Sequence, residues 1–283
     1  MALRPARQQG YVLLAFVALL SVVTFSFVVG YSTVLAKKEV AALLTNQKAF
    51  IASAASQVEA AYVANLAEVD GTTTSGSFRN PSQFLSLAGI TPKWGMQAAV
   101  SNVLSARGVA YTVVALWIPT STDTQNPPSF DATTGTFNSC PNAAAPCAPR
   151  AYALVSGLTL QQQALQSALQ QLNDLAAKEQ EYFKAKALFD PDHDIGINYF
   201  RAPDGNCDDP NQMPCIDQYT AVGSTAVPPL LGIPASTQMN PWGLPLETSN
   251  LQDSSSAAPP YSMAFRTSTP WGASYTVLAL QPI

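Results

Sequence analysis

The side chains best suited to chemistry are seven aspartates between residues 190 and 217: Asp190, Asp192, Asp194, Asp204, Asp208, Asp209 and Asp217. The first three alternate along the chain, as the carboxylate ligands at the start of a calcium loop do. Five of the seven are candidate ligands for Ca²⁺: Asp190, Asp192, Asp194, Asp208 and Asp209. The spacing departs from a calcium loop, because Gly196 comes one position late and no Glu closes the loop. A solvated acidic loop is the alternative interpretation, and no other cofactor is expected.

One histidine, His193, lies within this acidic segment. A catalytic triad would have to use it, and a metal site with several histidines is impossible. The chain also lacks the Gly-x-Ser-x-Gly, His-Glu-x-x-His and Gly-Lys phosphate-loop motifs. We therefore expect that the protein is not an enzyme and that His193 is a surface residue of a loop.

The charge balance argues against nucleic acid as a partner. The 283 residues include 14 Lys and Arg against 18 Asp and Glu, a formal net charge of −4, and no basic patch stands out. Clustered basic residues supply most of the affinity of nucleic-acid-binding proteins. Hydrophobic residues make up 47% of the chain and charged residues only 11%, which also excludes a disordered acidic tail.

Four cysteines occur as two close pairs, Cys140 with Cys147 and Cys207 with Cys215, each in a loop that contains proline. Three pairings are possible in principle, and the short separations favour the local one. Such disulfides indicate an oxidising compartment, and each stabilises a fold by about 2–3 kcal/mol. No zinc site is expected, because the spacings are wider than Cys-x-x-Cys.

The elements that must position these loops begin with a membrane helix. No charged residue occurs from Gln8 to Ala36, and the apolar run within this stretch is long enough to cross a bilayer as a helix. Basic residues lie on both sides of the run, so charge alone does not set its orientation. The cysteines and the long polar body place the body outside the cytoplasm. We expect a single transmembrane helix over residues 11–36.

The helical pattern continues after the membrane segment, over residues 37–69. Apolar residues recur there at steps of three and four, which predicts one apolar stripe on an amphipathic helix. Residues 11–69 are therefore expected to form one helix, apolar all round in its first half. A globular body must cover the stripe of its second half.

The remainder of the chain predicts an α+β fold. Short and long helices are expected over 96–107 and 159–188, and the glutamines of the second are expected to lie largely on a solvated face. Residues 120–149 are expected to form a long loop. Strands are expected at 109–118, 152–156, 244–249, 261–267 and 274–280. The last three predict a C-terminal antiparallel sheet packed on the long N-terminal helix.

The junction Arg7-Gln8-Gln9-Gly10-Tyr11, followed by the apolar helix, resembles the leader of type IV pilins and type II secretion pseudopilins. The resemblance implies that a prepilin peptidase cuts after Gly10 and methylates Tyr11. The turn Pro241-Trp242-Gly243 resembles one that precedes C-terminal strands in many pseudopilins, where the Trp fills the core. Some pseudopilins also bind calcium in C-terminal loops.

This resemblance divides the chain into a leader (1–10), a transmembrane helix (11–36), a spine helix (37–69) and an exported head (70–283). Most pilins have a Glu five residues past the cut, whereas this chain has Ala15. In the family that Glu pairs with the terminal amine of a neighbouring subunit, and its absence resembles a subunit at the fibre tip.

The function implied is that of a large minor pilin or pseudopilin, which initiates, caps or decorates a type IV pilus or a secretion pseudopilus. The implied partners are other pilin or pseudopilin subunits, the prepilin peptidase and the inner-membrane assembly platform. The implied location is the bacterial inner membrane, with an exported head that can become part of a periplasmic or extracellular fibre. The alternative is a signal-anchored periplasmic binding protein that does not polymerise.

Overall fold

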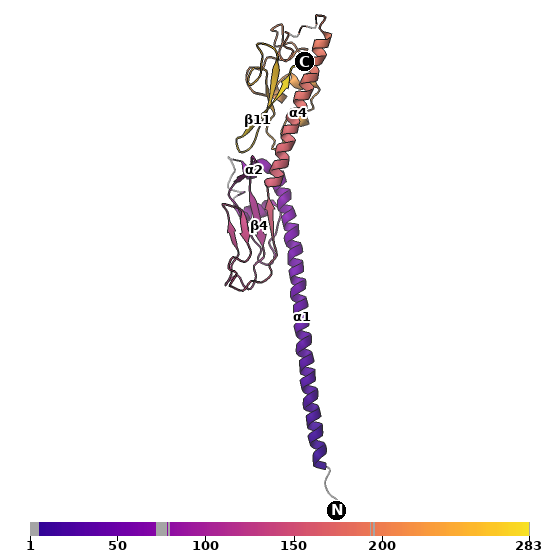
Figure 1. The fold of residues 1–283 in the computed structure, drawn as a ribbon. Coiled ribbons are helices and arrows are strands. Elements are labelled where there is room, and N and C mark those ends of the chain that lie inside the picture. Colours follow the sequence, from indigo (N-terminus) through magenta and orange to yellow (C-terminus); the bar gives the residue numbers. More distant parts are fainter. Residues whose placement is uncertain (1–5, 72–77, 79, 193, 195, 283) are drawn as a thin grey trace, which may run out of the picture.

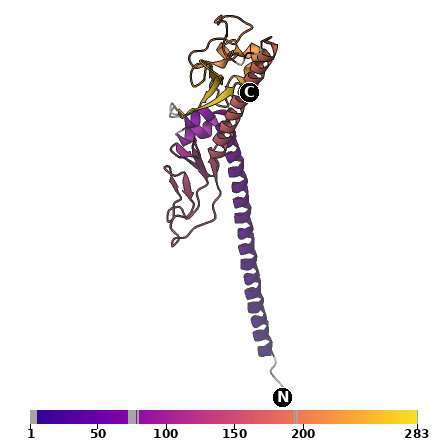
Figure 2. The same ribbon diagram turned by 45° about the horizontal axis from the view of Figure 1, so that its top comes forward.

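The computed structural model describes residues 6–71, 78, 80–192, 194 and 196–282. Two long helices set its long axis: α1 (Ala6–Ala64) and α4 (Leu158–Phe189), which begins near the end of α1 and continues away from it (Figures 1 and 2). Each helix has a sheet packed on it. We call residues 80–156, on α1, the proximal lobe and residues 190–282, on α4, the distal lobe.

Helix α1 confirms the predicted long helix and ends five residues early. The side chain of Asn65 donates to the carbonyl of Ala61 at 2.7 Å, and such local bonds compete with helix continuation. A separate turn, α2 (Leu66–Asp70), completes the segment. Side chains from Ala15 to Leu43 are exposed, and burial of the stripe then follows helical spacing, with four positions buried in the proximal lobe: Ile51, Ala54, Val58 and Tyr62.

The proximal sheet has three antiparallel strands in the order β1-β4-β7. These are β1 (Gln97–Val100), β4 (Val113–Trp117) and β7 (Tyr152–Ser156). Apolar side chains of β4 and β7 pack on the stripe of α1, together with helix α3 (Pro81–Leu87). On the other face of the sheet, a hairpin of β5 (Ser129–Asp131) and β6 (Thr136–Asn138) brings Phe137 onto Trp117, with ring centroids 5.3 Å apart.

The helix predicted over residues 96–107 is wrong, because this segment forms β1 and β2 (Leu104–Ala106). Strand β2 pairs with β3 (Val109–Tyr111) through a two-residue turn. Both turn residues, Arg107 and Gly108, have positive φ, of 52° and 79°, as the tight turns of hairpins require. Pairing with neighbouring strands therefore overrides the helical spacing of the apolar residues.

The distal sheet has four antiparallel strands in the order β11-β10-β9-β8. They are β8 (Thr220–Ala221), β9 (Glu247–Ser249), β10 (Ser262–Ser268) and β11 (Ser274–Leu280). Three short helical turns lie between β8 and β9: η2 (Val222–Ser224), α5 (Val227–Leu231) and η3 (Ala235–Thr237). Helix α4, predicted to within two residues, packs against β10 and β11.

The α+β fold with a long helix packed on antiparallel strands is confirmed. The strands that α1 mainly contacts are β4 and β7, whereas the C-terminal sheet packs on α4. The physical reason is that α4 supplies a second apolar stripe: Leu172, Leu175, Ala176 and Phe183 are buried in the distal core. The head is therefore built on two helices, α1 and α4, which follow one another along its long axis and each carry one sheet.

Candidate functional site

The first candidate site is the exposed apolar part of α1. By length and composition, the helical stretch Ala15–Ala64 contains a segment able to cross a membrane, and that segment is not buried in the head. Hydroxyl groups within it bond to their own helix: Ser21 and Thr24 each donate to the carbonyl four residues earlier at 2.8 Å. Such bonds satisfy polar side chains in lipid or in an apolar fibre core. Gly10 and Tyr11 lie in α1 on the same continuous helix.

The second candidate site is the junction between the two lobes, where the turn Pro241-Trp242-Gly243 lies. Gly243 has a φ of 74°, and the side chain of Asn240 accepts hydrogen bonds from the backbone of Trp242 and Leu244. Trp242 is 5% exposed and packs with Ala164 and Ala168 of α4. Trp242 therefore fills the joint between the two lobes.

Trp242 is also the end of a buried polar network that crosses the joint. Its Nε1 donates to Oε1 of Gln161 at 2.7 Å, and Nε2 of Gln161 donates to Oδ2 of Asp70 at 2.7 Å. The same Nε2 donates to the carbonyl of Leu66 at 3.0 Å. Gln161 comes from α4 and Asp70 from α2, so the network links the distal turn to the end of the α1 spine.

The network continues into the proximal lobe. The hydroxyl of Tyr62 in α1 donates to Oδ2 of Asp70, and that of Thr112 donates to Oδ1 at 2.6 Å. The Thr112 backbone N–H donates to the Tyr62 hydroxyl at 2.9 Å. Burial, with the nearby Asp70 carboxylate as a second cause, raises the pKa of Tyr62 far above its ordinary value, so this hydroxyl keeps its proton. Gly157 is required here, because a Cβ at that position would lie 1.9 Å from the Tyr62 oxygen.

This network could not be found from the sequence. Gln161 is fully buried, whereas Gln163, Gln166 and Gln170 are exposed and the other glutamines of α4 are half-buried. The prediction of a largely solvated glutamine face is therefore wrong for Gln161. The only usable signal was the Pro-Trp-Gly turn, which indicated a buried indole and hence a nitrogen in need of an acceptor.

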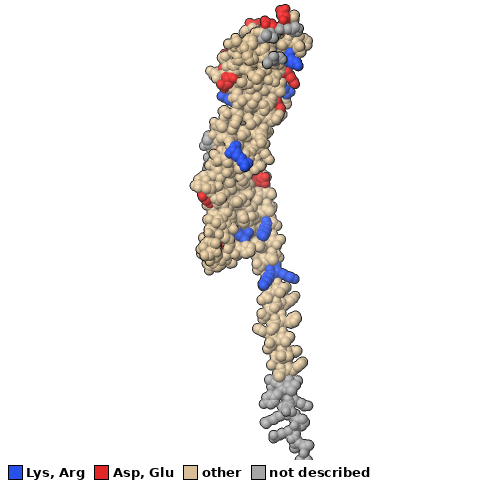
Figure 3. Space-filling view, viewed as in Figure 1, with Lys and Arg blue, Asp and Glu red and all other residues tan. Residues whose placement is uncertain are grey.

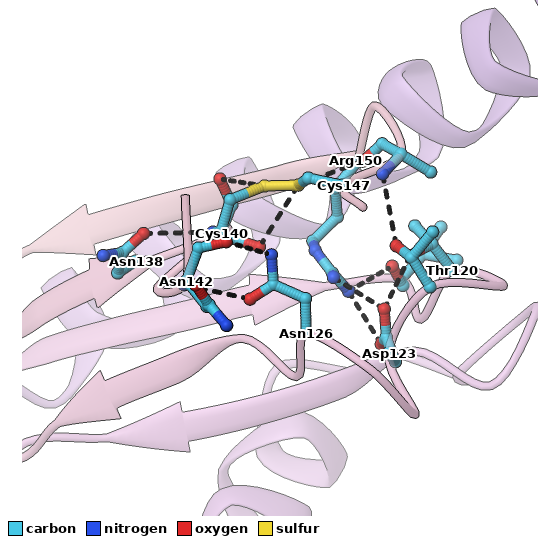
Figure 4. Close-up of a disulfide and its surroundings, with 12 residues drawn as sticks. Thr120, Asp123, Asn126, Asn138, Cys140, Asn142, Cys147 and Arg150 are labelled. Atoms are coloured by element: carbon cyan, nitrogen blue, oxygen red, sulfur yellow. Dashed lines mark hydrogen bonds and ion pairs between the residues drawn. A yellow bond between two sulfur atoms is a disulfide. The ribbon is translucent and has the colours of Figure 1, made fainter. Parts of the chain in front are cut away.

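The two disulfides have the predicted local pairing. Cys140 and Cys147 are bonded with Cα atoms 6.0 Å apart, and Cys207 and Cys215 with Cα atoms 5.1 Å apart. Figure 4 shows the first disulfide beside Asn126, whose side chain exchanges two hydrogen bonds with the backbone of Asn142. One disulfide therefore braces the proximal lobe and the other the distal lobe.

The acidic segment does not assemble a metal site among the described residues, where no group of three His, Cys, Asp or Glu side chains could hold an ion. Asp190 and Asp194 instead accept bonds from nearby backbone N–H groups. Asp192 is exposed, and the side chain of Asp209 accepts from Asn211 and Gln212. Asp208 is exposed as well. His193 lies outside the described residues.

Glu179 is a buried carboxyl that sequence reasoning missed. It lies on the inner face of α4 and is fully buried, and neither carboxyl oxygen has a hydrogen-bond partner in the described structure. Burial raises the pKa of Glu179 well above its ordinary value. Burial therefore favours the neutral form of this carboxyl, and its unpartnered oxygens destabilise the distal core.

No family model matches the chain, and no curated protein or solved structure matches it. The class of protein rests on the structure itself. A long N-terminal apolar helix packed against antiparallel sheets is a pilin-like architecture. The membrane-capable helix and the two disulfides indicate an anchored, exported protein.

Proposed function

We propose that the protein is a minor pilin or pseudopilin, a structural subunit of a type IV pilus or of a type II secretion pseudopilus. The observation that carries the proposal is the continuous helix α1, whose apolar segment projects from the head and is covered by nothing in the described chain. Such a segment can lie in a bilayer before assembly and pack with equivalent helices in a fibre core afterwards. This role is associative and requires no catalysis.

The leader resemblance supports processing by a prepilin peptidase at Gly10 and Tyr11. Ala15 supports a position at the fibre tip, because a subunit without the docking carboxylate cannot pair with the terminal amine of a subunit ahead of it. The elongated two-lobed head would then extend the fibre beyond its shaft. The other proposed partners are the subunits below it and the inner-membrane assembly platform.

Site-specific photo-crosslinking in the native host tests this proposal. A photoreactive amino acid at Phe27, exposed in the apolar segment, should crosslink to other fibre subunits in sheared fibres. The same group at Leu251, exposed in the distal lobe, should not crosslink to shaft subunits if the head lies at the tip. Absence of the protein from fibres, with α1 crosslinked only to lipid, would favour a signal-anchored binding protein that does not polymerise.

A further inference from the structure

The base of the proximal lobe, residues 119–128 and 139–149, lies at the end of the head nearest the membrane segment. Thr112 contacts Tyr62 near the end of α1, and β4 runs from there toward Trp117. Trp117 pairs with Gln97 in β1, close to Trp94, whose ring packs on Phe50, earlier in α1. Strand β4 therefore runs back toward the N-terminal end of α1, and the segments that follow it form the base.

Figure 3 shows that this base reaches the level of the lowest basic side chains along α1. These belong to Lys37 and Lys38, the first basic residues whose side chains the structure describes. They directly follow the charge-free membrane segment, where lysines mark the level of lipid headgroups. If the helix spans the bilayer up to Ala36, the base of the head must stand at the membrane surface.

The composition of the base suits that place. Residues 119–149 contain two acids and no basic residue. One of the acids, Asp123, is paired with Arg150 through two hydrogen bonds of 2.7 and 2.9 Å, and this bonding lowers the pKa of Asp123 below its ordinary value. The other, Asp131, belongs to β5, which lies back along the sheet. The part of residues 119–149 that faces the membrane therefore has almost no unpaired negative charge. Anionic headgroups would repel such charge.

The base is also braced against deformation. Disulfide Cys140–Cys147 closes one basal segment, and the Asn126–Asn142 pair ties it to the other. The Ala148 N–H donates to the Thr122 hydroxyl at 3.2 Å, which is a second link between the two segments. The outward side chains between the cysteines are small and uncharged, with Ala144 exposed at their centre.

We propose that these two basal segments, residues 119–128 and 139–149, form a foot that rests on the phospholipid surface while α1 spans the membrane. The inference rests on the membrane anchoring within the proposed function. The foot would hold the head upright before assembly and would leave the bilayer when the subunit enters a fibre.

Depth-dependent fluorescence quenching in nanodiscs tests the foot. The full chain has no free cysteine, so single variants A144C and Q125C in the foot, A257C in the distal lobe and V28C in the membrane segment can each be labelled. All four positions are exposed. The nanodiscs contain phosphatidylethanolamine and phosphatidylglycerol, with a nitroxide on the headgroup or on the acyl chain.

The expected result is that the headgroup nitroxide quenches labels at 144 and 125 several-fold more than the label at 257. The acyl-chain nitroxide should quench the label at 28. If 28 is quenched while 144 and 125 match 257, the foot is overturned and the anchor stands. If 28 is not quenched, the anchoring fails, and the foot fails with it. Two foot positions protect the test against a disturbed disulfide at A144C.

Discussion

The proximal and distal lobes are built alike, each with an antiparallel sheet packed on the apolar stripe of a long helix. Their loops differ in charge. Residues 119–149 of the proximal lobe contain two acids, whereas residues 190–217 of the distal lobe contain seven acids and one basic residue. The buried carboxylate of Asp70, beside α1, accepts hydrogen bonds from Tyr62 and Thr112, whereas the carboxyl of Glu179 in the distal core has no hydrogen-bond partner in the described structure. The same architecture thus carries a lobe with few acids beside the membrane-capable segment of α1 and an acidic lobe farther from that segment.

The joint at Trp242 holds the two lobes together, so replacement of Trp242 should cause the largest loss of stability. Trp242→Ala deletes a buried indole and its bond to Gln161, and should lower the free energy of unfolding by about 3–5 kcal/mol. Because the joint couples the lobes, we expect one thermal transition for the wild type and two for the variant. Calorimetry measures both effects. Trp94→Ala, at a half-exposed indole, is the control and should cost much less. An equal loss in both variants would show that the joint has no special role.

Loss of each disulfide should destabilise mainly its own lobe, and by less than the loss of Trp242 destabilises the protein. The pairs C140S/C147S and C207S/C215S should each lower stability by about 2–3 kcal/mol, as expected for short loops. Hydrogen exchange should increase in the proximal loops for the first pair and in the distal loops for the second. If either double variant increased exchange in both lobes alike, the division into two cores would be wrong.

Removal of the hydrogen-bond network across the joint should lower the free energy of unfolding by less than removal of the Trp242 indole does. In Gln161→Ala, Nε1 of Trp242 loses its acceptor in a buried site, with an expected loss of about 1–3 kcal/mol. Gln166→Ala, at an exposed position on the same helix, is the matched control and should stay within about 0.5 kcal/mol of the wild type. Urea unfolding followed by tryptophan fluorescence measures both values. A loss no larger than that of the control would contradict the network.

Glu179 predicts a difference between the lobes that depends on pH. Its pKa is raised in the folded state, so the unfolded chain releases this proton at a lower pH than the folded chain does. Stability is therefore lost as the pH rises above the ordinary value, by up to about 1.4 kcal/mol for each unit by which the pKa is raised. Glu179→Gln should match the wild type at pH 4 and become the more stable protein at pH 7. A constant difference across this range would contradict the buried, protonated carboxyl.

Elements with strong local signals could be predicted from the sequence, and contacts between distant segments could not. The long apolar helix, α4 and strands β10 and β11 follow from periodicity, and the disulfides follow from short separations. The strands at residues 97–106 were missed because their apolar spacing also suits a helix, and only pairing with β4 and β3 decides between the two. Gln161 and Glu179 look like surface residues of a polar helix. Only the fold shows that α2 and the turn at Trp242 cover Gln161 and that Glu179 is buried in the distal lobe.

The candidate site divides in the same way. Adjacent residues predict a junction at Gly10 and Tyr11, and adjacent residues also mark the Pro-Trp-Gly turn. The network from Tyr62 to Trp242 joins residues far apart in the chain, and no local pattern marks its members. The acidic aspartates were noticed because they are clustered in sequence, yet the described structure uses several of them to accept bonds from nearby backbone and side-chain groups.

The most direct test of the central claim is the mass of the N-terminal peptide of the protein purified from its own membranes. A pilin-like subunit processed at the leader should begin at Tyr11 and have one additional methyl group on its terminal amine. A chain that retains Met1 or Ala2, or that begins at another residue, would contradict processing as a pilin. The head would then belong to a membrane-anchored protein that does not enter a fibre.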